Sequence, residues 1–180
     1  MTLAALALMT SPALGQEAEV SVQPKFGNGA LEGCQLTFDV TFRDFAYDQG
    51  RWVQGSGSFV LYNFPEAGVG MMLKLGIAPL EPRDAPVISP TTAYFINGYS
   101  TNADETLSNT ESDTPGFRLV MFRGGEQTLT ALVGMHYGGL DIGYTRDGGR
   151  GAQQFHVPID ESLSADWMGC QSTLLSAGEG

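Results

Sequence analysis

Residues 34–43 alternate strictly between apolar and polar side chains, and this alternation constrains the fold more than any other feature of the chain. Cysteine, leucine, phenylalanine and valine occupy the even positions, whereas glutamine, threonine, aspartate and arginine occupy the odd positions. Successive side chains of a β-strand point to opposite faces, while a helix would spread the apolar residues around its circumference. The segment is therefore predicted to be a strand with one face in a hydrophobic core.

The remainder of the chain carries further strand patterns separated by turn residues. The strand-like segments are residues 51–62, 71–77, 91–96, 117–123, 127–137, 140–145 and 152–157. Glycine pairs and an Asp-Gly-Gly turn separate the last four of them, as is typical of hairpins. Four prolines make residues 78–90 an extended connection, because neither a helix nor a strand interior accepts that spacing. Residues 100–116 are predicted to form a polar loop, and residues 160–167 a short helix with Asp160 as its N-cap.

These elements predict an all-β chain, because they show no strand–helix–strand alternation. We expect an antiparallel β-sandwich of about eight strands with one short C-terminal helix. The proline-rich connection and the polar loop are interpreted as crossovers between the two sheets. The alternative is a closed up-and-down barrel like that of the lipocalins. Gly50-Arg51-Trp52 is similar to the G-x-W pattern of that family, although it follows a complete strand, whereas the family places it near the start of the first one.

The first fifteen residues have the features of a secretory signal peptide. They contain no charged side chain, residues 3–9 form an apolar run, and Ala13 and Gly15 place small residues before an expected cleavage site. The run is too short to span a bilayer, and no basic residue precedes it, which departs from the usual pattern. The segment predicts export to the periplasm or the medium.

The two cysteines indicate a disulfide and set the bounds of the expected domain. Cys34 and Cys170 are the two cysteines of the sequence, and an even count in an exported chain predicts a disulfide. A loop of about 135 residues would gain roughly 4–5 kcal/mol from such a cross-link. Residues 16–33 are expected to be a flexible lead-in, residues 34–170 a single β domain, and residues 171–180 a frayed tail.

The charge of the chain excludes one large class of partners. Nine Lys and Arg residues stand against twenty Asp and Glu residues, for a formal net charge of −11. Proteins that bind nucleic acid through phosphates need a basic surface, so no nucleic-acid partner is expected. Nucleophile-elbow, phosphate-loop and zinc-finger spacings are absent from the sequence. We also expect no transmembrane segment after the leader, because no later run approaches about 18 apolar residues.

His136 and His156, the two histidines, form one candidate site with Asp141. If residues 127–137, 140–145 and 152–157 are adjacent strands, all three side chains share the polar face of the sheet. A His–Asp–His group there would bind a divalent metal or perform acid–base chemistry. The alternative is three solvated polar residues on an amphipathic sheet.

The polar loop supplies a second candidate. Its carboxylates, which would be oxygen ligands for Ca²⁺, are Asp104, Glu105, Glu111 and Asp113. The regular spacing of a calcium loop is absent, so the simpler interpretation is a solvated acidic loop, and no cofactor is expected.

Three aromatic residues near the same loop are candidate ligand-binding residues. They are Tyr94, Tyr99 and Phe117. Aromatic rings beside a loop can stack on a sugar or a peptide, although they are more often core residues of alternating strands.

The function favoured by these observations is non-catalytic. We expect an exported β-domain of bacterial type that binds an unidentified protein or small ligand, or has a structural role in the cell envelope. One alternative is a small-ligand carrier, with Met71 and Met72 lining a barrel cavity. The other is a metal-dependent or acid–base hydrolase that uses His136, Asp141 and His156.

Overall fold

Two antiparallel sheets form the body of the protein in a computed structural model, which describes residues 17–64, 68–96, 106–147 and 151–176. The larger sheet has the strand order β1-β2-β3-β4-β7-β6 and the smaller one the order β5-β8-β9. The strands of the larger sheet are β1 (Ala18–Gly27), β2 (Ala30–Asp44), β3 (Arg51–Phe64), β4 (Gly68–Pro79), β6 (Thr106–Glu111) and β7 (Arg118–Arg123). Those of the smaller sheet are β5 (Thr92–Ile96), β8 (Gly139–Thr145) and β9 (Gln153–Pro158). The helices are α1 (Glu126–His136) and α2 (Glu161–Ser176). The predicted signal peptide lies outside the described residues.

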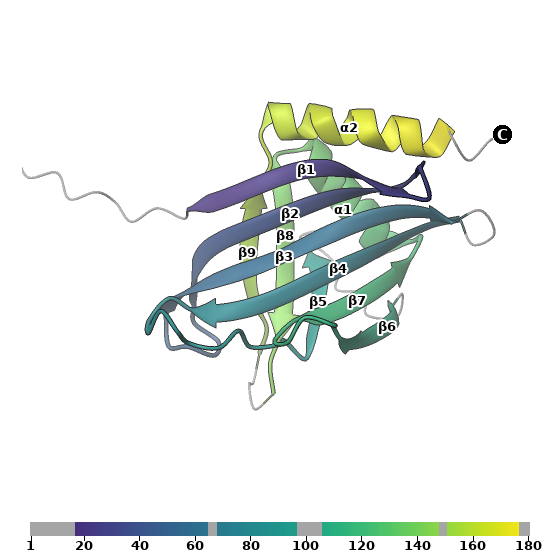
Figure 1. Cartoon of the computed structure of the whole chain (residues 1–180). Helices are drawn as coiled ribbons and strands as arrows, with labels where there is room; N and C mark the ends of the chain where they lie inside the picture. Colours follow the sequence, from purple (N-terminus) through teal and green to yellow (C-terminus); the bar gives the residue numbers. More distant parts are fainter. Residues whose placement is uncertain (1–16, 65–67, 97–105, 148–150, 177–180) are drawn as a thin grey trace, which may run out of the picture.

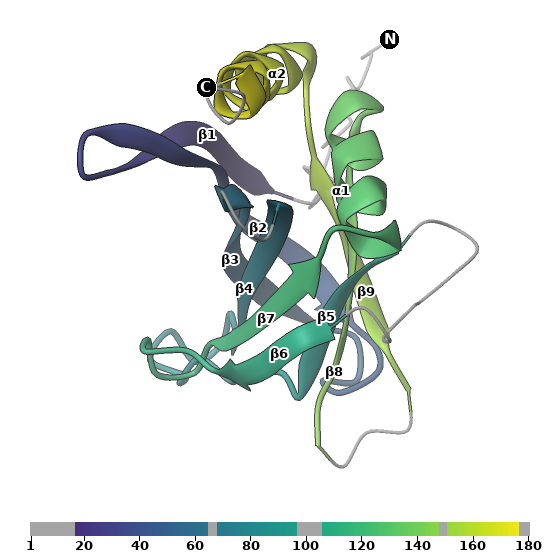
Figure 2. The ribbon, with the colours of Figure 1, turned by 90° about the vertical axis from the view of Figure 1, so that its right-hand side faces the viewer.

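The two sheets pack face to face, so the predicted β-sandwich with a C-terminal helix is confirmed. In Figure 1 the strands β8 and β9 run behind the larger sheet and across its strands, and α2 lies along the edge formed by β1. Figure 2 shows α1 beside the smaller sheet. Both expected crossovers are present, because β4 and β6 belong to the larger sheet whereas β5 belongs to the smaller one. The sheets do not close into a barrel, so the lipocalin-like alternative was wrong.

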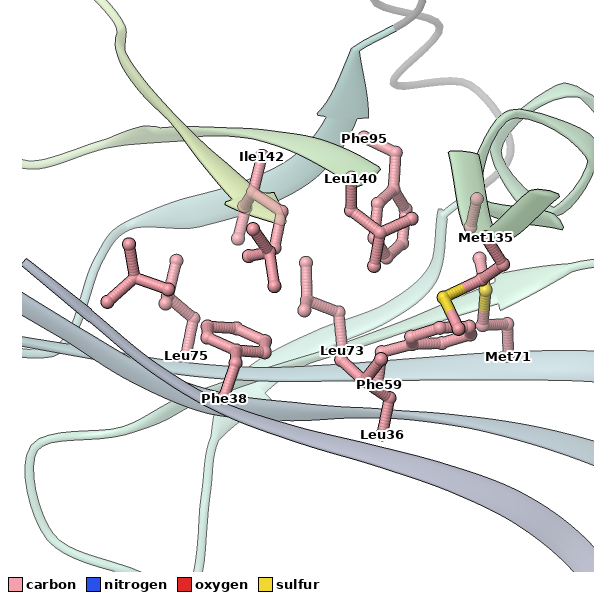
Figure 3. Close-up of a cluster of buried hydrophobic side chains, with 14 of the residues drawn as sticks. Leu36, Phe38, Phe59, Met71, Leu73, Leu75, Phe95, Met135, Leu140 and Ile142 are labelled. Atoms are coloured by element: carbon pink, nitrogen blue, oxygen red, sulfur yellow. The ribbon is translucent and has the colours of Figure 1, made fainter. Parts of the chain in front are cut away.

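The alternation first noticed in residues 34–43 places one face of β2 in the core. Leu36, Phe38 and Val40 are at most 2 % exposed. In Figure 3, Leu36 and Phe38 face side chains from the smaller sheet and α1. Aromatic rings fill much of the space between the sheets, with the rings of Phe42 and Phe155 stacked 4.6 Å apart. The interior of the described sandwich is therefore packed with side chains from both sheets.

The predicted disulfide is present and joins β2 to α2. Cys34 and Cys170 are bonded at a sequence separation of 136 residues. The helix begins as expected, because the side chain of Asp160 accepts a hydrogen bond from Leu163 N at 2.8 Å. It is longer than predicted and continues to Ser176, since Leu174 is buried against the sandwich. Residues 171–176 are thus helical rather than frayed, and residues 177–180 lie outside the described part.

Two segments predicted to be irregular form strands. Residues 18–27, in the expected lead-in, form β1, and every residue of β1 is paired with β2. Residues 106–111, in the expected polar loop, form β6 and pair with β7. Both are edge strands with mostly exposed side chains. β6 lacks the apolar alternation by which strands with a buried face are recognised, whereas residues 18–26 do alternate, with Val20 and Val22 packed against the core, so β1 was recognisable and the expected lead-in was wrong.

Residues 127–137 were predicted to be a strand, and this was wrong, because residues 126–136 form α1. Its apolar residues do occupy alternate positions, as in a strand. The buried side chains, however, include Gln127, Ala131 and Met135, which are spaced four residues apart as on one face of a helix. One predicted strand is absent and two unpredicted strands are present, so the described residues form nine strands where eight were expected.

Candidate functional site

A pair of side chains on the outer face of the smaller sheet is the clearest polar feature of that surface. Asp141 on β8 lies directly opposite His156 on β9 in the register of the two strands. The Nδ1 atom of His156 lies 2.8 Å from Oδ1 of Asp141, a hydrogen-bond distance. The side chains are 45 % and 57 % exposed for His156 and Asp141, respectively. The pair is therefore accessible to a ligand from solvent.

Two glycines of β8 create the space in which this pair sits. A Cβ atom at Gly139 would lie 2.4 Å from Cε1 of His156, and one at Gly143 would lie 2.4 Å from Cε2 of Tyr94. The imidazole and the phenol ring consequently rest on the β8 backbone, on either side of Asp141. Only glycine permits such a close approach of rings to the main chain.

A groove runs beside the pair, between α1 and the smaller sheet. Its volume is about 270 Å³, and its wall includes Leu129 and Val133 of α1 and Tyr137, the residue that follows the helix. These three side chains are 62 %, 45 % and 85 % exposed, which is unusual for large apolar residues that lie together. Glu126 and Asp141 are the acidic residues of the lining, which contains no Lys or Arg among the described residues. The groove thus combines an apolar wall with negative charge.

The predicted three-residue site is only partly assembled. Asp141 and His156 meet because β8 and β9 are paired strands, as expected. His136 belongs to the last turn of α1 rather than to a neighbouring strand, so the expectation that it shares their face was wrong. It is exposed and forms no hydrogen bond or ion pair with Asp141 or His156.

The acidic-loop candidates do not gather in the described structure. Asp104 and Glu105 lie outside the described residues, and Glu111 is an exposed residue of β6. Asp113 pairs with Lys74 at 3.3 Å. Hydrogen bonds from Ser112, followed by the interactions with Lys74, lower the pKa of the Asp113 carboxyl. In the ranges that the structure describes, no three His, Cys, Asp or Glu residues are grouped as metal ligands.

The two aromatic candidates that the structure describes are not brought together either. Tyr94 lies on the outer face of the smaller sheet beside Asp141, and burial raises the pKa of its hydroxyl. Phe117 lies on the opposite side of the sandwich, beneath the ammonium group of Lys74 at 5.5 Å. Tyr99 lies outside the described residues. Of the two candidates that the structure describes, Tyr94 borders the site of Asp141 and His156, whereas Phe117 does not.

A buried polar cluster at the turn between β2 and β3 escaped the sequence analysis. Asp44 is fully buried and accepts hydrogen bonds from Tyr47 N at 2.8 Å and from the Tyr144 hydroxyl. Arg146 reaches the neighbouring Asp48 at 2.8 Å. Burial first, and then the hydrogen bond to Asp44, raises the pKa of Tyr144 far above its ordinary value. The cluster attaches this turn to the end of β8, which is a structural role.

No protein-family model, curated protein or solved structure matches this chain. No helix in the described ranges has the length and apolar character needed to cross a bilayer. The function must therefore be inferred from the residues and their geometry.

Proposed function

We propose that the protein is an exported, non-catalytic binding module whose ligand site is the groove between α1 and β8. The observation that carries this proposal is the exposed apolar wall of Leu129, Val133 and Tyr137 beside the Asp141–His156 pair. Large apolar side chains gathered at a concave surface mark binding sites more often than isolated exposed residues do.

A non-catalytic role is favoured over a hydrolase by three features. His136 is separate from the pair, and both cysteines are in the disulfide, so no thiol nucleophile exists. Asp141 and His156 are about half exposed. Charges in water are strongly screened, whereas catalytic groups gain their strength in sites that exclude water.

A carrier with an internal cavity is disfavoured by the packing of the core. Met71 is 1 % exposed and lies among the core side chains of Figure 3. Met72, its neighbour on the same strand, points to the opposite face of the larger sheet. The two methionines therefore do not line a common interior.

Export rests on the leader pattern and the disulfide. A disulfide that links distant parts of a domain is stable in oxidising compartments and rare where thiols are kept reduced. Together with the predicted signal peptide, it favours the periplasm or the medium as the location.

The chemistry of the groove favours a small amphipathic cation. Its volume of about 270 Å³ accommodates one ring system or one aliphatic side chain. Glu126 and Asp141 supply negative charge, and the Oδ2 atom of Asp141 has no hydrogen bond with a described residue. An ammonium group would bind at this carboxylate while its apolar part packs on Val133 and Tyr137.

Tryptamine is a suitable probe, with indole-3-propionate as its anionic counterpart. Titration of the ¹⁵N-labelled protein should shift the amide signals of α1 and β8 saturably with tryptamine and much less with the acid. Val133→Lys should weaken tryptamine binding about tenfold or more, because it removes apolar area and adds a like charge. Met168→Lys, a matched change at an exposed methionine of α2, should leave binding unaltered. Equal binding of the two probes, or shifts elsewhere in the molecule, would count against the proposal.

A further inference from the structure

The outer edge of β1 presents unpaired backbone groups over half of the strand. Thr41 N donates to Glu17 O at 2.9 Å, which makes these two residues a hydrogen-bonded pair of the β1–β2 ladder. Such pairs recur at every second residue of an antiparallel ladder. The residues that turn their N–H and C=O groups away from β2 are therefore Ala18, Val20 and Val22. No described residue hydrogen-bonds to these outward groups.

The other edges of the two sheets are better protected. β5, β6 and β9 have five or six residues each, whereas β1 has ten. The outward groups of Phe95 on β5 are bonded to the side chain of Gln127, at 2.7 Å to its N–H and 3.1 Å to its C=O. Short edge strands and covered edges are the usual protection against strand pairing.

β1 itself is protected only in its second half, where α2 runs beside it across the groove lined by Pro24 and Phe26 (Figure 1). Pro24 occupies an outward position and has no N–H, and Lys25 follows it. Proline and lysine both discourage pairing at an edge. The segment from Ala18 to Val22 has neither, so this half remains available to an added strand.

The two faces beside this edge differ in chemistry. On the outer face, Glu17, Glu19 and Asp39 surround a shallow hollow together with Thr41 and Gln54. On the inner face, an apolar groove of about 580 Å³ separates the β1–β2 hairpin from α2. Val22 and Phe26 line this groove, and Phe26 is 67 % exposed. A strand added beside Ala18 to Val22 would place one set of alternate side chains by the acidic hollow and the other beside Val20 and Val22, where the groove begins.

We propose that the free edge of β1 docks an extended segment of a partner protein in which basic and apolar residues alternate. The main-chain groups of Ala18, Val20 and Val22 would pair with the segment and provide affinity. Basic side chains would lie opposite Glu17 and Glu19, and apolar ones beside Val20 and Val22. A second copy of this chain fits less well, because its own β1 would bring a further Glu17 and Glu19 to an edge that is already acidic.

Amide hydrogen exchange of the purified protein tests the edge directly, with a capped peptide of alternating lysine and valine as the probe. In the free protein, the outward amides of Ala18, Val20 and Val22 should exchange rapidly, and those of Glu19 and Ser21 slowly. The peptide should protect the outward amides and leave the other two unchanged. Its affinity should fall as NaCl is raised, because exposed charges are screened. A peptide of alternating glutamate and valine serves as the control and should not bind.

Two variants distinguish edge pairing from simple charge attraction. Val20→Pro removes the central outward N–H and should reduce affinity for the lysine–valine peptide at least about tenfold. Val20→Thr keeps that N–H and the branched side chain, and should retain binding. The proposal is overturned if the peptide gives no protection at about 1 mM, where an affinity of only −4.1 kcal/mol would be detected. Equal binding of the acidic peptide would also overturn it. So would a dimer of the free protein that Val20→Pro dissociates, since a second copy would then be the occupant.

Discussion

The side-chain amide of Gln127 pairs with both main-chain groups of Phe95, as the peptide group of a neighbouring strand would. Its Oε1 accepts from Phe95 N at 2.7 Å, and its Nε2 donates to Phe95 O at 3.1 Å. Both residues are 1 % exposed. The edge of β5 is thereby closed by a residue of α1, and the helix is fixed against the smaller sheet.

Replacing Gln127 tests how much this pairing contributes to stability. Gln127→Leu fills a similar volume but leaves the N–H and C=O of Phe95 unpaired in the core, which should cost about 2–4 kcal/mol. Urea denaturation monitored by circular dichroism measures the change. Gln23→Leu, at an exposed glutamine of β1, should change stability by less than about 0.5 kcal/mol. A loss no larger than that of this control would mean that the pairing does not stabilise the fold.

We expect the free energy of unfolding to fall at alkaline pH because Tyr144 is buried. In the unfolded chain its hydroxyl ionises near its ordinary pKa of 10.0, whereas burial and Asp44 raise the pKa in the folded protein. The stabilisation is therefore fully present below pH 10.0 and is lost as the pH rises above it, by up to about 1.4 kcal/mol per pH unit. Tyr144→Phe should remove this part of the dependence.

The measurement is the free energy of unfolding at pH 9 and pH 11 for both proteins. The wild type should lose about 1 kcal/mol more than Tyr144→Phe between these values. Tyr137→Phe, at a tyrosine that is 85 % exposed, is the matched control and should behave as the wild type. Parallel pH profiles of wild type and Tyr144→Phe would contradict the prediction.

Alanine substitutions at two adjacent glycines distinguish the effect of a steric clash from that of backbone conformation at the candidate site. Gly138 and Gly139 both have positive φ, but a Cβ atom meets nothing within 4 Å at Gly138 and overlaps His156 at Gly139. Gly138→Ala should cost about 1–2 kcal/mol, from conformation alone. Gly139→Ala should cost more, about 3 kcal/mol, and displace the imidazole from Asp141.

Thermal unfolding and the ¹⁵N resonances of the His156 ring report these two effects. The ring signals should change in Gly139→Ala and remain as in the wild type in Gly138→Ala. Identical behaviour of the two variants would show that the close approach of His156 to the backbone is unimportant.

Removal of the disulfide should destabilise the fold strongly. Changing Cys34 and Cys170 to Ala together opens a loop of 136 residues. The expected loss is roughly 4–5 kcal/mol on the chain-entropy account. Dithiothreitol should lower the thermal midpoint of the wild type and have no effect on the double variant. A midpoint that reductant leaves unchanged in the wild type would argue against this contribution.

The sequence predicted those parts of the fold where a local pattern coincides with a buried face. β2 was recognisable because its apolar residues alternate without exception, and Asp160 because a carboxylate at a helix start satisfies a free backbone N–H. Asp141 and His156 were expected to share one face of the sheet, and the register of β8 and β9 places them opposite each other. The disulfide followed from there being two cysteines.

The errors have a common physical origin. Alternate apolar residues between positions 127 and 137 fit a strand, yet the same residues also supply the buried and exposed faces of α1. Which structure forms depends on the surfaces that Ala131 and Met135 meet, and these come from distant strands. His136 was misplaced for this reason, and the groove beside Val133 was not foreseen. β1 was missed although residues 18–26 alternate between apolar and polar side chains, because its inner face, with Val20 and Val22, is only partly buried at the edge of the sheet.

The bond between Cys34 and Cys170 makes most of the chain a closed covalent ring with two tails. Strands β3 to β9 lie entirely within the ring, and β1 is the strand that lies entirely outside it. Detachment of β1 therefore leaves the ring closed, and it uncovers only the edge of β2 and the part of the core on which Val20 and Val22 pack. The first strand should open and close as a separate unit, at a lower free energy than global unfolding. The cross-link, although it joins distant parts of the chain, thus leaves the N-terminal strand free to exchange its pairing.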